Sequence, residues 1–250
     1  MNTTLKSILL IFTILFVLQS CKTEKKELKI TDSVSLFKAM KKRYDEKWFQ
    51  NFTFKQHTIS FDENEVKTDS IVWIESVSYP YHFRIDRDIS RDNYTIYKND
   101  STYNFKNDTL VNLSNRAAAH LVFKGGLYFI SVDEVINKLQ KYGYNTSVFK
   151  KDSFMEQPVY VIGNSNNQIW LHANKFYCMR RIYTTANKKR VNVVYDNFKK
   201  LGKGYVEQKV TFYVDGIKRL EEFYFDIKIK KNFDKKIYDV KTNNKWYLNY

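Results

Sequence analysis

Apolar and polar residues alternate with a period of two through most of the chain, as expected for β-strands that bury one face. Turn-forming pairs such as Asn99-Asp100, Asn107-Asp108 and Asp215-Gly216 separate the alternating runs, as they do in antiparallel hairpins. The pattern predicts strands at 52–54, 58–61, 71–74, 81–85, 94–97, 102–105, 110–111, 159–162, 169–172, 176–183, 190–198, 206–214 and 220–229. The chain is therefore expected to be mainly antiparallel β.

Two segments carry a helical period instead. After a cap at Asp32 or Ser33, apolar residues at 36, 37, 40 and 44 predict an amphipathic helix over 33–50. Ser131 and Glu134 match a capping box and precede apolar residues at helical spacing, so a second helix is expected to end near Tyr142-Gly143. Residues 117–122 are expected to add a helical turn that Gly125-Gly126 ends.

Residues 1–20 have a third pattern, in which Lys6 precedes an apolar run from Ile8 to Leu18. A charged start, a short apolar core and a small residue at Ser20 indicate a secretory signal. The run is shorter than the roughly 20 residues of a membrane span. Cys21 follows Ser20 and resembles the lipobox cysteine of bacterial lipoproteins, with Gln19 where a small or aliphatic residue is usual. The resemblance implies cleavage before Cys21 and its acylation; an ordinary cleaved signal and an uncleaved anchor are the alternatives.

The expected organisation is a signal at 1–20, a charged tether at 21–32 and a single domain at 33–250. The 230 residues left after cleavage fit one β-rich domain. The formal net charge is +15, and loss of Lys6 leaves +14. For an exported, membrane-anchored protein, this charge favours anionic headgroups, glycans or an acidic protein as partners over nucleic acid. A solvated basic surface with no ligand is the alternative, and we expect a monomer.

Sequence motifs of enzymes and metal sites are missing. No Gly-rich phosphate loop, Gly-x-Ser-x-Gly elbow or Cys-x-x-Cys pair occurs. The four histidines are scattered, and Glu221 and Glu222 point to opposite faces of a predicted strand. Cys178 lies in an apolar, alternating segment and is predicted to be a buried structural thiol. We therefore expect no catalytic residue, no metal and no cofactor.

The order of elements, together with residues 73–86, 159–181 and 201–229, resembles the LolA/LolB-like superfamily of outer-membrane lipoprotein-sorting and lipid-carrier proteins. Residues 73–86 resemble the family's Pro-containing strand pair that ends in an aromatic-Arg motif. Two positions depart from the family, since Tyr79 stands where carriers tend to have Arg and Gln208 where many relatives have Pro. The resemblance implies an α+β, mainly β fold: an unclosed half-barrel of strongly curved antiparallel sheet with helices covering its concave face.

The resemblance also implies a non-catalytic lipoprotein of the cell envelope that holds lipid or lipoprotein acyl chains against the concave face. Anchoring through Cys21 suits the outer membrane better than the inner, with the domain in the periplasm or on the surface. The residues expected to line the lipid site are Tyr81, Phe83, Ile85, Val210, Phe212, Val214, Phe223, Phe225 and Ile227. The alternative is an envelope scaffold or interaction protein with a filled core, and a cavity of several hundred Å³ beneath the helices would favour the first interpretation.

Overall fold

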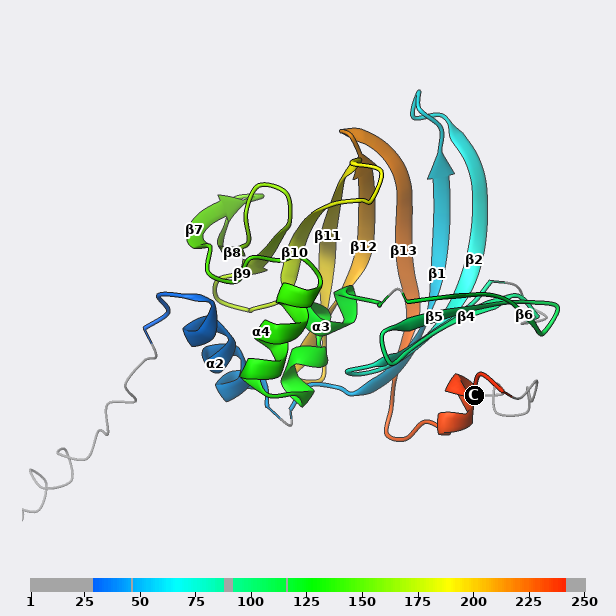
Figure 1. Cartoon of the computed structure of the whole chain (residues 1–250), viewed down its shortest axis with the longest axis horizontal. Helices are drawn as coiled ribbons and strands as arrows, with labels where there is room; N and C mark the ends of the chain where they lie inside the picture. Colours follow the sequence, from blue (N-terminus) through cyan, green and yellow to red (C-terminus); the bar gives the residue numbers. More distant parts are fainter. Residues whose placement is uncertain (1–28, 46, 88–91, 116, 242–250) are drawn as a thin grey trace, which may run out of the picture.

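A single antiparallel sheet dominates the computed structural model, which describes residues 29–45, 47–87, 92–115 and 117–241. Thirteen strands lie in the order β6-β5-β4-β3-β2-β1-β13-β12-β11-β10-β9-β8-β7 (Figure 1). The first six strands are β1 (Asn51–Phe61), β2 (Lys67–Ser78), β3 (His82–Asp86), β4 (Tyr94–Lys98), β5 (Ser101–Lys106) and β6 (Thr109–Ser114). The other seven are β7 (Phe149–Phe154), β8 (Gln157–Ile162), β9 (Gln168–His172), β10 (Cys178–Thr184), β11 (Arg190–Leu201), β12 (Gly204–Val214) and β13 (Ile217–Lys230).

The pairing of β1 with β13 joins two meanders into one curved sheet. Strands β6 and β7 form its two edges and do not pair with each other, so the barrel stays open. The mainly β half-barrel expected from the sequence is therefore confirmed. Strand β7 was not predicted, because its sequence FKKDSF is polar on both faces and its middle residues are exposed, as an edge strand allows.

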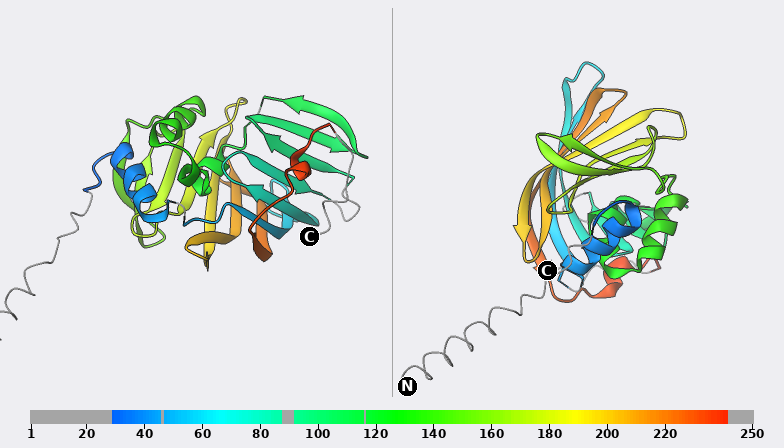
Figure 2. Two further views of the ribbon diagram at one scale, coloured as in Figure 1. Left: turned by 90° about the horizontal axis from the view of Figure 1, so that it is seen from below. Right: turned by 90° about the vertical axis from the view of Figure 1, so that its left-hand side faces the viewer.

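The helices lie against the concave side of the sheet (Figures 1 and 2). They are α2 (Ser33–Tyr44), α3 (His120–Lys124), the 3₁₀ turn η1 (Gly126–Phe129) and α4 (Val132–Lys141), and a second 3₁₀ turn, η2 (Lys235–Tyr238), follows β13. Asp32 caps α2 by accepting a hydrogen bond from the Ser35 amide, and Ser131 caps α4 in the same way. Helix α2 buries the predicted apolar stripe at 36, 37, 40 and 44.

Helix α2 is shorter than predicted. It ends at Tyr44, because Asp45 adopts an extended ψ of 132°. Trp48 then packs its ring 5.0 Å from Tyr44 and 4.6 Å from Tyr128, and it stacks on Phe49 at 5.4 Å. The aromatic residues that extended the helical pattern toward residue 50 form a block in the connection to β1 instead.

The outer face of β3 and β4 is covered by the segment after β13. Ile237 and Tyr238 of η2 pack with Tyr94, Ile96 and Phe105 in a separate apolar cluster. Arg84, the Arg of the predicted aromatic-Arg motif, is buried beneath this cover. The C-terminal part of the described chain thus seals the side of the sheet opposite the helices.

A bulge in β13 changes which residues face inward. Thr53 pairs with Lys228 but Lys55 pairs with Phe225, so β13 has one residue more than β1 across this stretch. Asp226 takes up the irregularity with a positive φ of 51°. Strict alternation is broken at this point. Before the bulge the even-numbered residues of β13 face the concave side, and after it the odd-numbered residues do.

Candidate functional site

A cavity of about 340 Å³ lies between the concave face of the sheet and the segment that leads into α3. Its size is at the lower end of the roughly 300–1,000 Å³ of small-molecule sites. Strands β1 to β4 and β10 to β13 supply its wall, and residues 117–121 and Lys124 cover it. The sheet curvature and the helical cover together therefore enclose space that side chains do not fill.

One part of the cavity wall is apolar and aromatic. It is formed by Phe52, Phe54, Trp73, Val77, Phe83, Ile85, Tyr97, Val210 and Phe212. Several of these residues are almost completely shielded from outside solvent, since Phe52, Phe54 and Val77 are 3–4% exposed. Such a wall suits an acyl chain or another apolar group.

The structure separates the nine residues that the sequence placed at the lipid site. Phe83, Ile85, Val210 and Phe212 line the cavity. Val214 and Ile227 pack against the main core without lining the cavity. Tyr81 does not line the cavity, and its hydroxyl donates a hydrogen bond to Glu134 of α4.

The placement of Phe223 and Phe225 on the concave face was wrong. Phe223 pairs with His57 and Phe225 with Lys55, and residues directly opposite each other in an antiparallel pair share a face. The Lys209 ammonium lies 5.5 Å from the centre of the Phe223 ring, and Phe225 is 42% exposed. Before the bulge, it is Glu222 and Tyr224 that face the cavity.

Three glutamates that the sequence interpretation missed point into the same cavity. Glu75, Glu207 and Glu222 come from β2, β12 and β13, and each is at most 8% exposed. The Tyr224 hydroxyl donates to Glu222 at 2.9 Å, and Lys124 at the end of α3 forms an ion pair with Glu207. The Lys124 ammonium also lies over the Tyr195 and Tyr224 rings at 5.4 and 5.5 Å.

The environment disfavours ionisation of two of these carboxyls. Burial raises the pKa of Glu222 to about 7, although the hydrogen bond from Tyr224 opposes the shift. Burial, and then the nearby charge of Glu222, raise the pKa of Glu75 well above its ordinary value. Burial therefore favours the neutral form of Glu75, and Glu222 is partly neutral near pH 7.

A half-buried cation, Arg181 of β10, lines the cavity as well, and its Nε is shielded from solvent. Its guanidinium carbon lies 4.2 Å from the centre of the Tyr183 ring and 5.8 Å from that of Phe123. Its neighbour Arg180 faces the other way, stacks over Trp170 and Phe154, and donates to Asn192 at 2.8 Å. The cavity is thus amphipathic, with an apolar part and a charged part.

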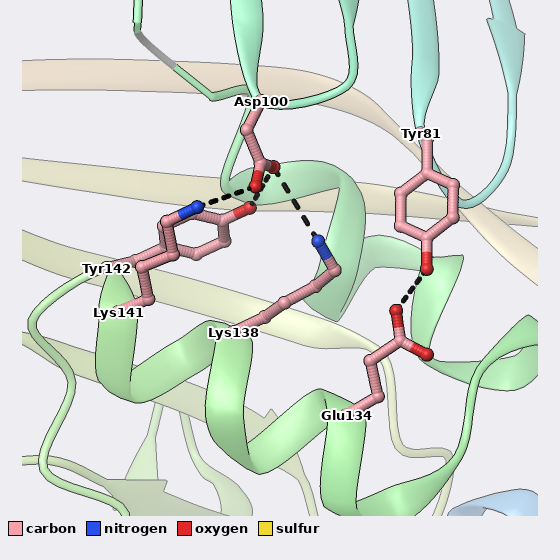
Figure 3. Close-up of polar contacts among 6 residues, drawn as sticks. All are labelled: Tyr81, Asp100, Glu134, Lys138, Lys141 and Tyr142. Carbon is pink, nitrogen blue, oxygen red and sulfur yellow. Dashed lines mark hydrogen bonds and ion pairs between the residues drawn. The ribbon is translucent and has the colours of Figure 1, made fainter.

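A polar latch holds α4 to the sheet beside the cavity (Figure 3). Asp100, in the turn between β4 and β5, contacts Lys141 at 2.9 Å, Lys138 at 3.6 Å and the Tyr142 hydroxyl at 2.8 Å. Burial raises the pKa of Asp100, but the bonds from Lys141 and Tyr142 outweigh this effect and leave its pKa below the ordinary value. With the Tyr81–Glu134 bond, the latch fixes the helical cover at the tips of the strands.

Metal-ligating side chains do not come together within the described residues. No group of three or more His, Cys, Asp or Glu side chains in that part of the chain is arranged to hold a metal ion. Cys178 is buried, and burial raises the pKa of its thiol to about 12, which fits the predicted structural role. No helix in the same part of the chain is long and apolar enough to cross a membrane. Cys21 and residues 1–28 lie outside the described residues.

Comparison by sequence finds no matching protein family and no matching curated protein. Comparison of structures finds solved proteins with a similar fold. A LolA superfamily protein from Nitrosomonas europaea superposes with a TM-score of 0.54 at 11% identity, over 83% of this chain and 97% of that one. An outer membrane lipoprotein-sorting protein domain from Vibrio parahaemolyticus gives 0.55 at 9% identity, over 82% and 95%. A DUF1329 family protein from Desulfovibrio piger gives 0.57 at 9% identity, over 84% and 98%.

The chain therefore has a LolA-like fold, as the sequence resemblance implied. At these identities the likeness concerns the fold.

Proposed function

We propose that the protein is a non-catalytic binding module of the bacterial cell envelope that holds the acyl chain of a lipid or lipoprotein in the concave cavity. The observation that carries the proposal is the cavity itself, about 340 Å³ in volume and walled on one side by apolar and aromatic side chains. A filled core, as the scaffold alternative requires, would leave no such space. One structural neighbour, from Vibrio parahaemolyticus, is named as an outer membrane lipoprotein-sorting protein domain, which agrees with the proposal.

In this proposal Cys21 carries the lipid anchor and keeps the cavity near a membrane, the outer membrane in preference to the inner. Two acyl chains suffice for stable anchoring. Metabolic labelling with an alkyne fatty acid, applied to the wild type and to Cys21→Ala, tests the anchor separately from the cavity. Labelling is expected only in the wild type, and equal labelling of both would contradict the lipobox interpretation.

Binding in the cavity is tested with a chain that begins at residue 22, which retains every described element. Native mass spectrometry after gentle purification is expected to show bound amphiphile, and fluorescent acyl probes are expected to bind and be displaced by unlabelled acyl chains.

Ala118→Trp places a large side chain in the covering segment, where Ala118 lines the cavity, and is expected to reduce probe binding. Val111→Trp is the matched control, because Val111 is 60% exposed on β6 and does not line the cavity. The proposal fails if no amphiphile is retained and no probe binds, or if the two variants bind alike.

A further inference from the structure

Arg181 lies at one end of the cavity wall. It pairs across the sheet with Ile169 of β9 and Val193 of β11, and it faces the concave side. The apolar part of the wall begins at the other end, on β1, β2 and β3, where Phe54, Val77 and Phe83 reside. The sheet order places β13, β12 and β11 between the two ends.

No described side chain pairs with Arg181 as a partner of opposite charge. Among the described residues no carboxylate lies within 4 Å of its guanidinium, and its buried Nε has no hydrogen-bond acceptor. Arginine cannot lose its proton in a protein. Taking such a charge out of bulk water costs several kcal/mol unless another group compensates it.

The groups around Arg181 do not supply the missing charge. The side chains that interact with it electrostatically are the phenols of Tyr144, Tyr183 and Tyr195 and the thiol of Cys178. Burial raises the pKa of Tyr144 to about 12, and it raises the pKa of Tyr195 well above the ordinary value. The phenols of Tyr144 and Tyr195 and the thiol of Cys178 are therefore neutral at pH 7 and can offer only hydrogen bonds.

The carboxyls elsewhere in the cavity are also engaged. Glu207 is paired with Lys124, and Glu222 accepts from Tyr224. Glu75 is buried on β2, which four intervening strands separate from β10. The fold thus keeps a permanent cation in contact with the cavity and leaves its counter-charge to a bound molecule.

We propose that Arg181 binds the anionic headgroup, a carboxylate or a phosphate, of a single-chain amphiphile whose tail lies against the apolar wall of β1, β2 and β3. This proposal rests on the proposed function, since it assigns a headgroup to the same cavity. A guanidinium presents several donors in a planar fork that matches both headgroups. The phenols of Tyr144, Tyr183 and Tyr195 can donate to the remaining headgroup oxygens.

The test compares three amphiphiles of equal chain length: a fatty acid, a monoacyl phosphate and a fatty alcohol. Affinities are measured by displacement of a neutral acyl probe from the chain that begins at residue 22. The wild type is expected to bind both anions about 10-fold or more tighter than the alcohol, as charge-assisted hydrogen bonds predict. Comparison of the carboxylate with the phosphate then identifies the preferred headgroup.

Arg181→Met is expected to remove this preference while changing alcohol binding by less than about 3-fold, because the apolar wall is intact. Arg180→Met is the matched control, since it alters the adjacent residue of the same type on the outer face and should keep the preference. Arg181→Lys retains the charge without the fork and is expected to keep part of the preference. Thermal unfolding verifies that each variant is folded.

The outcomes separate the two proposals. Equal affinity of the wild type for the anions and the alcohol overturns the role of Arg181 but leaves acyl binding in place, and so does a preference that survives in Arg181→Met. If none of the three amphiphiles binds, the proposed function fails, and the headgroup site fails with it. If Arg181→Met does not fold, the ratio of anion to alcohol affinity in the wild type and in Arg181→Lys still tests the role of Arg181.

Discussion

Two arginines sit within the sheet in opposite electrostatic circumstances. Arg84, on the outer face of β3, is 1% exposed, contacts Asp86 at 2.8 Å, donates to the Ile237 carbonyl at 3.1 Å and lies 4.0 Å from the Tyr94 ring. Arg181, on the inner face of β10, has aromatic neighbours and no carboxylate within 4 Å among the described residues. Within the part of the chain that the structure describes, Arg84 has a counter-ion beneath η2, whereas Arg181 has none beside the cavity.

The difference teaches that burial alone does not identify a functional charge. Both side chains are long, cationic and packed on aromatic rings, but only one has its charge neutralised by the fold. A buried ion pair with satisfied hydrogen bonds specifies packing, whereas an unpaired ion beside a cavity is available to a ligand. The comparison leads to four predictions, the largest expected effect first.

The two arginines should differ most clearly in how the protein's stability responds to the loss of a charge. Asp86→Asn removes the carboxylate that contacts the buried Arg84 at 2.8 Å and is expected to cost about 3–5 kcal/mol of unfolding free energy. Arg181→Met removes a charge that no carboxylate compensates and is expected to change the stability of the ligand-free protein by less than about 1 kcal/mol, or to increase it. Urea unfolding of delipidated protein measures both. A larger loss for Arg181→Met than for Asp86→Asn would reverse the comparison.

The acids of the cavity should make stability depend on pH. Burial raises the pKa of Glu222 from 4.5 to about 7, so between these values the folded protein holds a proton that the unfolded chain has released. The folded state is therefore favoured at low pH, and this contribution is lost as pH rises through about 7. Glu222→Gln is expected to flatten this decline, by about 3 kcal/mol at most between pH 5 and pH 8.

Unfolding free energies at several pH values test this prediction. Glu221→Gln controls for the loss of one glutamate from β13, because Glu221 pairs instead with Lys209 and Lys218. An unchanged slope in Glu222→Gln would mean that this carboxyl does not govern the pH dependence.

The polar latch of α4 is intermediate between Arg84 and Arg181, because its charges are paired but partly open to solvent. Asp100→Asn is expected to cost about 0.5–1 kcal/mol, as for other ion pairs near a surface. It should also accelerate amide hydrogen exchange in α4 more than elsewhere. Asp152→Asn breaks a single Lys150 pair on β7, away from α4, and is the control. Equal exchange in the two variants would show that the latch does not hold the helix.

The sequence predicts the fold well where alternation is regular. Phe83 and Ile85 of the regular strand β3 line the cavity, because β3 pairs with β2 without a register shift. The charged part of the site was not predicted, because Glu75 comes near Glu207 and Glu222 only through the strand order β2-β1-β13-β12. No local sequence pattern predicts that strand order. Arg181 was missed for the same reason, since its lack of a partner is a property of the assembled sheet.

The last prediction concerns the boundary between the two faces of β13 at the Asp226 bulge. Uninterrupted alternation would give Phe225 and Ile227 the same environment, and their replacement by Ser should then cost similar amounts. In the structure Phe225 is 42% exposed opposite Lys55, whereas Ile227 packs against the main core. Phe225→Ser is therefore expected to change stability by less than about 0.5 kcal/mol, while Ile227→Ser costs about 1 kcal/mol or more. Equal losses would mean that β13 has no bulge, which would exchange the residues it presents to the cavity and to solvent.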